Sequence, residues 1–362
     1  MKISSYHKNT GDSVELVTSY ENLDYDKIYL SKVFTDTEVP EEILAMKNVE
    51  YGGTGFFLEN APALPQEIEH IMPDYHLYDN WVQHRLQEGG VRKDYTYYLD
   101  YSIGFLTRGC FRKCEFCVNK NYNRCVVHSP IQEFFDPSRP KLCFLDDNFL
   151  ACPKWESILR EVQETGKRFQ FKQGLDARLL TDKKIRALVN SKYDGDYIFA
   201  FDNINDRETI EKKLARFWEL YPNNKFHLKF YVLCGYDENG QWDEDFWEKD
   251  IADTFERIAI LRKYKAVPYV MRFEKCYSSP WHGIYSVIAA WANQPSFFKK
   301  FTFRDFCKYR GMGNKIREYK VDFDRYLADG NPKGASWRYL EELESAYPTI
   351  AREHFDVRFP DS

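Results

Sequence analysis

Short apolar runs recur through the middle of the chain, and an amphipathic stretch follows most of them. Runs of this length indicate buried strands, and the stretches between them have the periodicity of helices that cover a sheet. Such alternation predicts parallel βα units. The expected strands are residues 102–106, 141–145, 168–172, 197–201, 228–233 and 268–273, and the expected helices are residues 157–165, 182–191, 206–221 and 245–264.

The pattern differs at the two ends of the chain. Near the N-terminus we expect strands over residues 13–19 and 27–33, a short helix over 39–46, a glycine-rich turn in YGGTGF and a Pro-rich linker over 61–78. After about residue 286, strand candidates stop and aromatic helical stretches follow.

The sequence therefore predicts an α/β fold in three parts. Residues 1–95 form a small N-terminal α/β domain, residues 96–285 a partial (β/α)6 barrel, and residues 286–362 a helical C-terminal extension. Barrels of this kind place their ligands at the carboxyl ends of the strands.

Composition and charge narrow the function classes. The chain is 43% hydrophobic and 30% charged, with a net charge of −5, which argues against a broad nucleic-acid surface and against a stable nucleic-acid partner. We find no apolar run of about 18 residues and no apolar signal-peptide region, so we expect no membrane partner and a cytoplasmic location. Thiols stay reduced there, and clustered cysteines then indicate metal binding or catalysis.

Three of the nine cysteines lie in the loop after the first predicted barrel strand, at the spacing C-x-x-x-C-x-x-C: Cys110, Cys114 and Cys117. Three thiolates on one short loop can hold three corners of an iron–sulfur cubane and leave its fourth iron open to another ligand. A zinc site with Cys125 as fourth ligand is the alternative, but the wide step from Cys117 to Cys125 fits zinc spacing poorly.

With an aromatic residue, Phe116, before the last cysteine, the chain resembles the radical S-adenosylmethionine (SAM) superfamily over about residues 96–285. The resemblance implies a 4Fe–4S cluster on the three cysteines, with SAM on the open iron. One electron then cleaves SAM to methionine and a 5′-deoxyadenosyl radical, which takes a hydrogen atom from a substrate. It also implies an electron donor such as flavodoxin or ferredoxin, and a position for Phe116 between cluster and adenine.

Polar residues follow the second and third barrel strands, where the superfamily binds SAM. Asp147 and Asn148 stand where the family often has Gly-Gly-Glu, and would accept from the SAM ammonium; a solvated turn is the alternative. In KQGLDAR, the resemblance implies ribose contacts for Gln173 or Asp176 and a carboxylate contact for Arg178. A local ion pair between Asp176 and Arg178 is the alternative.

After the fifth strand, Gly235 would let the adenine approach the main chain, and Cys234 is expected to be buried. The other polar groups near strand ends and in the basic cluster over residues 308–320 are substrate candidates. They are Asp146, Asp202, Asn203, Arg272, Glu274, His282, Arg310 and Lys315. Helix capping is the alternative for Asp202 and Asn203, a structural role for His282, and a solvated helical connection for the basic cluster.

One segment imitates a cofactor motif. Residues 74–79 begin like the cobalamin-binding D-x-H-x-x-G, with Asp74 and His76, but Asp79 replaces the glycine. We therefore expect the N-terminal domain to be cobalamin-like in shape at most, without cobalamin. A second cluster on Cys276 is not expected, because the sequence has no second cysteine triplet.

The superfamily does not specify the reaction. The short N-terminal unit together with TRGCFRKCEFC, LDDNF and QGLDAR is similar to the queuosine lyases of anaerobic gut bacteria, which release queuine from queuosine or its 5′-phosphate. The similarity implies a nucleoside or nucleotide substrate that is attacked at its ribose. Asp202 or Glu274 would bond the deazaguanine, and Arg310 or Lys315 would meet a 5′-phosphate. The alternatives are a radical SAM enzyme that modifies RNA or a peptide, such as a methylthiotransferase or methyltransferase, and a non-enzymatic iron–sulfur sensor.

Overall fold

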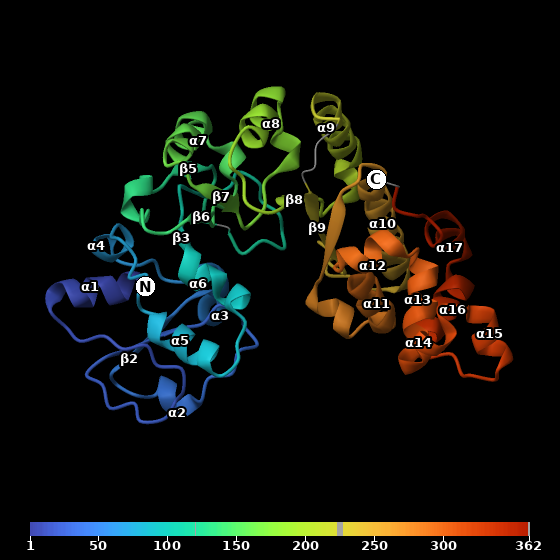
Figure 1. Ribbon diagram of the computed structural model, residues 1–362, viewed down its shortest axis with the longest axis horizontal. Coiled ribbons are helices and arrows are strands. Elements are labelled where there is room, and N and C mark those ends of the chain that lie inside the picture. The colour runs from blue at the N-terminus through green and yellow to red at the C-terminus, as the bar shows by residue number, and fades with distance from the viewer. Residues whose placement is uncertain (120, 223–226, 361–362) are drawn as a thin grey trace. The chain divides into compact units, whose positions relative to one another are not determined.

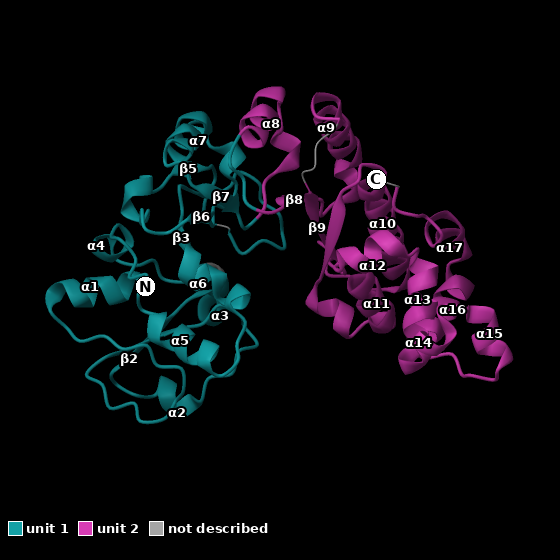
Figure 2. Ribbon diagram, viewed as in Figure 1, with its two compact units in different colours: residues 1–173, 191–194 teal, residues 174–190, 195–362 magenta. Residues whose placement is uncertain are grey.

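The computed structural model describes residues 1–119, 121–222 and 227–360 (Figure 1). The chain forms two compact units (Figure 2): unit 1 is Met1–Gln173 with Ser191–Asp194, and unit 2 is Gly174–Asn190 with Gly195–Ser362. The boundary falls inside the range predicted for the barrel, so each unit holds three of the six expected strands. Among the strands that the structure describes, none of the sheets closes into a barrel.

The N-terminal part of unit 1 is built on a two-stranded parallel sheet of β1 (Ile28–Ser31) and β2 (Val49–Gly52). The strand predicted over residues 13–19 is wrong: residues 12–18 have no regular secondary structure, and their side chains are mostly exposed. An alternating segment becomes a strand only where a partner strand and a buried face are present. The helices of this part are α1 (Lys2–Thr10), α2 (Glu41–Leu44), α3 (Thr54–Phe57), α4 (Gln66–Glu69), α5 (Asp79–Gln87) and α6 (Thr96–Asp100).

The second sheet of unit 1 is parallel, in the order β3 (Tyr101–Gly104), β6 (Lys141–Phe144), β7 (Arg168–Phe171). Helix α7 (Trp155–Glu164) connects β6 to β7, and a short antiparallel pair, β4 (Thr107–Arg108) and β5 (Val126–Val127), follows β3. Residues Ser191–Asp194 belong to this unit because they pair with β7: the Asp194 N–H donates to the Phe169 carbonyl at 2.7 Å. The 3₁₀ segments of unit 1 are η1 (Leu58–Asn60), η2 (Arg92–Tyr95), η3 (Ile131–Glu133) and η4 (Phe149–Ala151).

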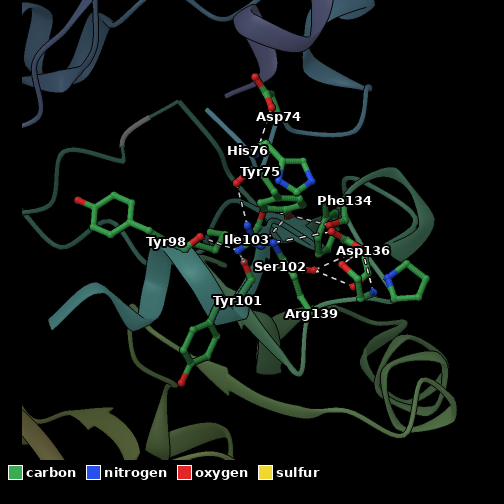
Figure 3. A network of polar contacts seen from close by, with 12 residues as sticks. Asp74, Tyr75, His76, Tyr98, Tyr101, Ser102, Ile103, Phe134, Asp136 and Arg139 are labelled. Carbon is green, nitrogen blue, oxygen red and sulfur yellow. Dashed lines mark hydrogen bonds and ion pairs between the residues drawn. The ribbon is translucent and has the colours of Figure 1, made fainter. Parts of the chain in front are cut away.

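The segment that imitates a cobalamin motif supports β3 instead (Figure 3). The Tyr75 hydroxyl donates to the Phe134 carbonyl at 2.7 Å and accepts from the Ile103 N–H at 2.8 Å. The buried Arg139 guanidinium lies over the Tyr75 ring and donates to the Tyr75 and Tyr101 carbonyls. The segment thus fixes the strand that leads into the cysteine loop.

Asp74 and His76 of that segment have local partners. The Asp74 carboxylate accepts from Lys8 at 2.7 Å and from the Ser4 hydroxyl at 2.6 Å. The exposed His76 ring bonds Asp79 at 2.7 Å, the residue that replaces the motif's glycine.

Unit 2 contains the other parallel sheet, in the order β10 (Val267–Arg272), β9 (Leu228–Cys234), β8 (Tyr197–Ala200). Its connecting helices are α8 (Asp182–Val189), α9 (Arg207–Leu220) and α10 (Glu244–Lys263). The six predicted strands and four predicted helices are therefore confirmed, within a few residues at their ends. The α/β class is confirmed too, and the union of both sheets in one partial barrel stays a prediction.

From His282 onward, the described residues of unit 2 form helices and their connections, in agreement with the helical part predicted from about residue 286. The Arg262 guanidinium, buried in α10, holds this part by donating to the carbonyls of Phe298, Phe301 and Val357. The helices are α11 (His282–Ala292), α12 (Pro295–Lys300), α13 (Phe303–Gly311), α14 (Ile316–Tyr319), α15 (Phe323–Ala328), α16 (Ala335–Ala346) and α17 (Pro348–His354). The 3₁₀ segments of unit 2 are η5 (Ala177–Leu179), η6 (Ile204–Asp206), η7 (Glu274–Tyr277) and η8 (Gly313–Lys315). None of the helices in the described ranges is long and apolar enough to cross a membrane.

Candidate functional site: the cysteine loop of unit 1

The loop between β4 and β5 carries the three clustered cysteines. The antiparallel pairs Thr107–Val127 and Arg108–Val126 bring its two ends together. Gly109, with φ +89°, starts the loop, and a Cβ at this position would lie 2.5 Å from the Arg124 carbonyl oxygen. Only glycine fits this close approach, so the start and the end of the loop are packed against each other.

Three consecutive residues at the carboxyl end of β6, Asp146, Asp147 and Asn148, hold the entry to this loop. We call them the strand-end clamp. Asp146 is the first of them. Its carboxylate accepts from the Thr107 N–H and hydroxyl, both at 2.6 Å, and from the Leu106 N–H at 3.2 Å. Burial raises the pKa of Asp146 to about 7, against the opposing effect of these hydrogen bonds. Asp146 was predicted to contact the substrate, but the structure gives it main-chain partners.

The other two clamp residues reach the first residues of the loop. The Asp147 carboxylate accepts from the Gly109 N–H at 2.6 Å. The Asn148 Nδ2 group donates to the Cys110 sulfur at 3.2 Å. The clamp thus contacts successive points along the chain, and it ends on a cysteine.

Asn148 is 3% exposed, and its Oδ1 atom has no hydrogen-bond partner among the described residues. An unpaired buried acceptor costs about 1–3 kcal/mol, so proteins keep few of them. The atom lies on a side chain that also contacts Cys110, and a bound ligand with an ammonium or amide donor would satisfy it. The contact of Asn148 with SAM stays a prediction.

The three cysteines of the loop are half-buried. The Cys110 sulfur also accepts from the Arg112 N–H at 3.3 Å, and the Cys117 sulfur from the Asn119 N–H at 3.4 Å. Cysteine sulfurs that receive N–H groups are a recurring feature of the ligands of iron–sulfur clusters. Phe116, which is 36% exposed, lies on the same loop, as a cover for a ligand there would.

The arrangement of the possible metal ligands is the next feature of the site. Within the described parts of the chain, we find no group of three or more His, Cys, Asp or Glu side chains gathered as a metal site. The fit to a cluster therefore rests on the donor chemistry of the loop: half-buried thiols that receive N–H groups.

Cys125, the fourth ligand of the zinc alternative, is buried at the far end of the loop. Burial raises the pKa of its thiol to about 12 in the absence of a metal ion. A bound metal ion would itself deprotonate a coordinating thiol. The zinc alternative therefore stays open.

In unit 2, the predicted SAM contacts Asp176 and Arg178 bond each other. The Asp176 carboxylate accepts from Arg178 Nε at 2.7 Å, and Arg178 Nη1 bonds Asp206 at 2.6 Å. The local ion pair, the alternative for this segment, is thus present. Gln173, the last residue of the first segment of unit 1, is exposed. Their contacts with SAM stay predictions.

Asp202 and Asn203 follow β8 and have main-chain partners. Asp202 accepts from the Leu233 N–H at 3.0 Å, and burial raises the pKa of its carboxyl. Asn203 accepts from the Asn205 N–H at 2.9 Å, which is the capping role considered as its alternative.

Gly235 has φ +76°, and its N–H donates to Asp250 at 2.9 Å. A Cβ at this position would overlap the Cys276 sulfur. The space that the missing side chain of Gly235 leaves is therefore filled by the buried Cys276 side chain of η7. Cys234 is buried as expected.

The remaining substrate candidates lie in unit 2. Arg272 donates to the Ser286 hydroxyl at 2.7 Å, and its guanidinium lies 4.8 Å from the centre of the Tyr277 ring. Lys315 is exposed and bonds the Asn331 side chain. Three further candidates are exposed: Glu274, His282 and Arg310.

Sequence reasoning missed Arg257 of α10. Its guanidinium is 2% exposed and donates to the carbonyls of Phe201, Asp202 and Leu233 at 2.7–3.1 Å. It thereby fixes the carboxyl ends of β8 and β9. The sequence offered only a weak signal, because Asp253 and Thr254 precede Arg257 on the same face of the helix and Leu261 follows it.

A scan of the chain against protein-family models found no match. A search of curated proteins found no match either.

Proposed function

We propose that this protein is a radical SAM enzyme whose 4Fe–4S cluster binds to Cys110, Cys114 and Cys117. The observation that carries the proposal is the loop of three half-buried thiols after β3, held by a clamp that leaves the buried acceptor Asn148 Oδ1 open. The spacing C-x-x-x-C-x-x-C and the parallel strands around it support the same assignment. When bound, the cluster and SAM supply a 5′-deoxyadenosyl radical for hydrogen abstraction.

The residues of this chain have distinct tasks in the proposal. Asn148 Oδ1 accepts from the ammonium of SAM, and Asp147 adds negative charge beside it. Asp146, which is buried under Leu106 and Thr107, keeps the loop entry in place. Phe116 excludes water from the ligand that the loop holds.

For the substrate, we propose queuosine or queuosine 5′-phosphate, with abstraction of a ribose hydrogen and release of queuine. The short N-terminal unit, taken together with TRGCFRKCEFC, LDDNF and QGLDAR, supports this choice by its similarity to small radical SAM proteins of anaerobic gut bacteria, among which is the queuosine lyase. The exposed Glu274 would accept from the deazaguanine, and the exposed Arg310 or Lys315 would meet a phosphate.

Anaerobic reconstitution with iron and sulfide tests the cluster. We expect the wild-type chain to bind iron and sulfide, and to form 5′-deoxyadenosine when SAM and dithionite are added. Cys114→Ala is expected to lose both properties. Cys143→Ala, in β6 and outside the loop, is the matched control and is expected to keep them. A Cys114→Ala chain that still forms 5′-deoxyadenosine, or a wild-type chain that binds no cluster, would refute the proposal.

The substrate is tested under the same conditions by adding queuosine or its 5′-phosphate and measuring queuine by mass spectrometry. Queuine formation that depends on SAM is the expected result. If 5′-deoxyadenosine forms without queuine, the lyase assignment is wrong, and tRNA or peptide substrates come next. A cluster that never cleaves SAM would indicate a sensor.

A further inference from the structure

Cys110 receives two N–H groups of different origin. One comes from the main chain of Arg112, two residues along the same loop, at 3.3 Å. The other comes from the Asn148 side chain, which follows another strand, at 3.2 Å. A main-chain donor is present whatever the side chain at its position, except in proline. The Asn148 donor depends on one amino acid.

The structure holds the Asn148 amide in this orientation. The residue is 3% exposed and begins η4, where Phe149 and Leu150 are also buried. On its other side, Asp147 is fixed to the Gly109 N–H at 2.6 Å. The amide therefore cannot turn to solvent without moving a buried segment, and its nitrogen is the end that can donate to the sulfur.

We infer that Asn148 is a positioning residue that makes the proposed cluster easier to reduce, through its hydrogen bond to the Cys110 sulfur. This inference rests on the proposed function. Reduction adds negative charge that spreads onto the cysteine sulfurs, and an N–H dipole directed at a sulfur stabilises that charge. Loss of the donor then makes the reduction potential more negative. This is separate from the role of Asn148 Oδ1 toward SAM.

The test measures the midpoint potential of the reconstituted protein by redox titration with EPR detection. The titration is run without SAM, so that a lost contact to SAM does not enter. Asn148→Leu keeps the size of the side chain and removes the donor. Asn148→Asp keeps the shape and adds a charge. Asn190→Leu, at an exposed asparagine that ends α8, is the matched control.

We expect the midpoint potential to shift to more negative values in Asn148→Leu and further in Asn148→Asp. Asn190→Leu should match the wild type. If Asn148→Leu binds no cluster, Asn148→Ala, which removes the donor without adding a charge, decides the test. A cluster whose potential is unchanged by loss of the donor overturns the inference and leaves the proposed function standing. A wild-type chain that binds no cluster overturns both.

Discussion

At the carboxyl end of β6 in unit 1, Asp146, Asp147 and Asn148 contact a loop that comes from another strand. At the carboxyl ends of β8 and β9 in unit 2, Asp202 and Gly235 have partners within their own sheet and its covering helix. The residue types are alike, since acidic and amide side chains follow buried strands in both units. Their partners differ.

The two strand ends differ in how much of their hydrogen-bonding capacity is used within the described residues. In unit 1, the clamp leaves a buried acceptor, Asn148 Oδ1, unpaired beside a half-buried thiol. In unit 2, the buried Arg257 and the pair of Asp176 with Arg178 satisfy their neighbours within the unit. Polar groups at a strand end therefore indicate a binding site only where some of their hydrogen-bonding capacity remains unused.

The largest expected change in stability comes from removing Arg257, which bonds main-chain carbonyls at the carboxyl ends of β8 and β9 in unit 2. Arg257→Met removes the donors to the carbonyls of Phe201, Asp202 and Leu233. Unpaired buried carbonyls cost about 1–3 kcal/mol each, so we expect the free energy of unfolding to fall by about 3–5 kcal/mol. Urea unfolding measures this. Arg207→Met, at an exposed arginine of α9, is the control. If both variants lower the free energy of unfolding equally, the hydrogen bonds of Arg257 to the strand ends do not stabilise unit 2.

The second prediction concerns how Asp146 of the strand-end clamp makes the free energy of unfolding depend on pH. The pKa of Asp146 is about 7 in the folded chain, whereas an aspartate in an unfolded chain has its ordinary pKa of 3.8. The folded state therefore binds the proton more tightly, and stability falls as pH rises from about 4 to about 7, by up to about 4 kcal/mol. Asp146→Asn does not titrate and should lack this fall. Urea unfolding of both proteins at pH 4.5 and 7.5 measures the change in the free energy of unfolding. An equal change in the wild type and in Asp146→Asn would show that the pKa of Asp146 is not raised by folding.

The third prediction tests why unit 2 needs a glycine after β9. Gly235→Ala forces the new methyl group against the Cys276 sulfur at a positive φ, with an expected cost of about 2–3 kcal/mol. Adding Cys276→Ala removes the overlap and should restore about 1 kcal/mol. Thermal unfolding of the single and double variants measures the coupling. Additive effects would mean that the glycine serves something other than this contact.

The smallest effect is expected at the start of the cysteine loop. Gly109→Ala meets the Arg124 carbonyl, whereas Gly166→Ala, also at a positive φ, meets nothing within 4 Å among the described residues. We expect Gly109→Ala to cost about 1–2 kcal/mol more than its control, because backbone strain is common to both and the overlap is not. Thermal unfolding gives the difference, and reconstitution should show less iron in Gly109→Ala. Equal stabilities would exclude tight closure of the loop.

Much of the fold could be predicted from the sequence, since the six strands of the two larger parallel sheets are largely apolar runs that must be buried wherever the chain folds. The strand expected over residues 13–19 failed because its alternation finds no partner strand. The Asp176–Arg178 pair and the Asn203 cap lay within the alternatives that the residues allowed. Their partners could not be chosen from spacing alone.

The sequence by itself determined the order of the strands and the cysteine triplet, because periodicity and spacing are local properties of a chain. Only the tertiary structure decided what the polar strand ends do. LDDN and FDNIND look equivalent as sequences. The first lies beside the loop that follows β3 and clamps it, while the second faces its own sheet. Which donor meets which acceptor depends on residues about 40 positions apart along the chain, and packing alone brings these together.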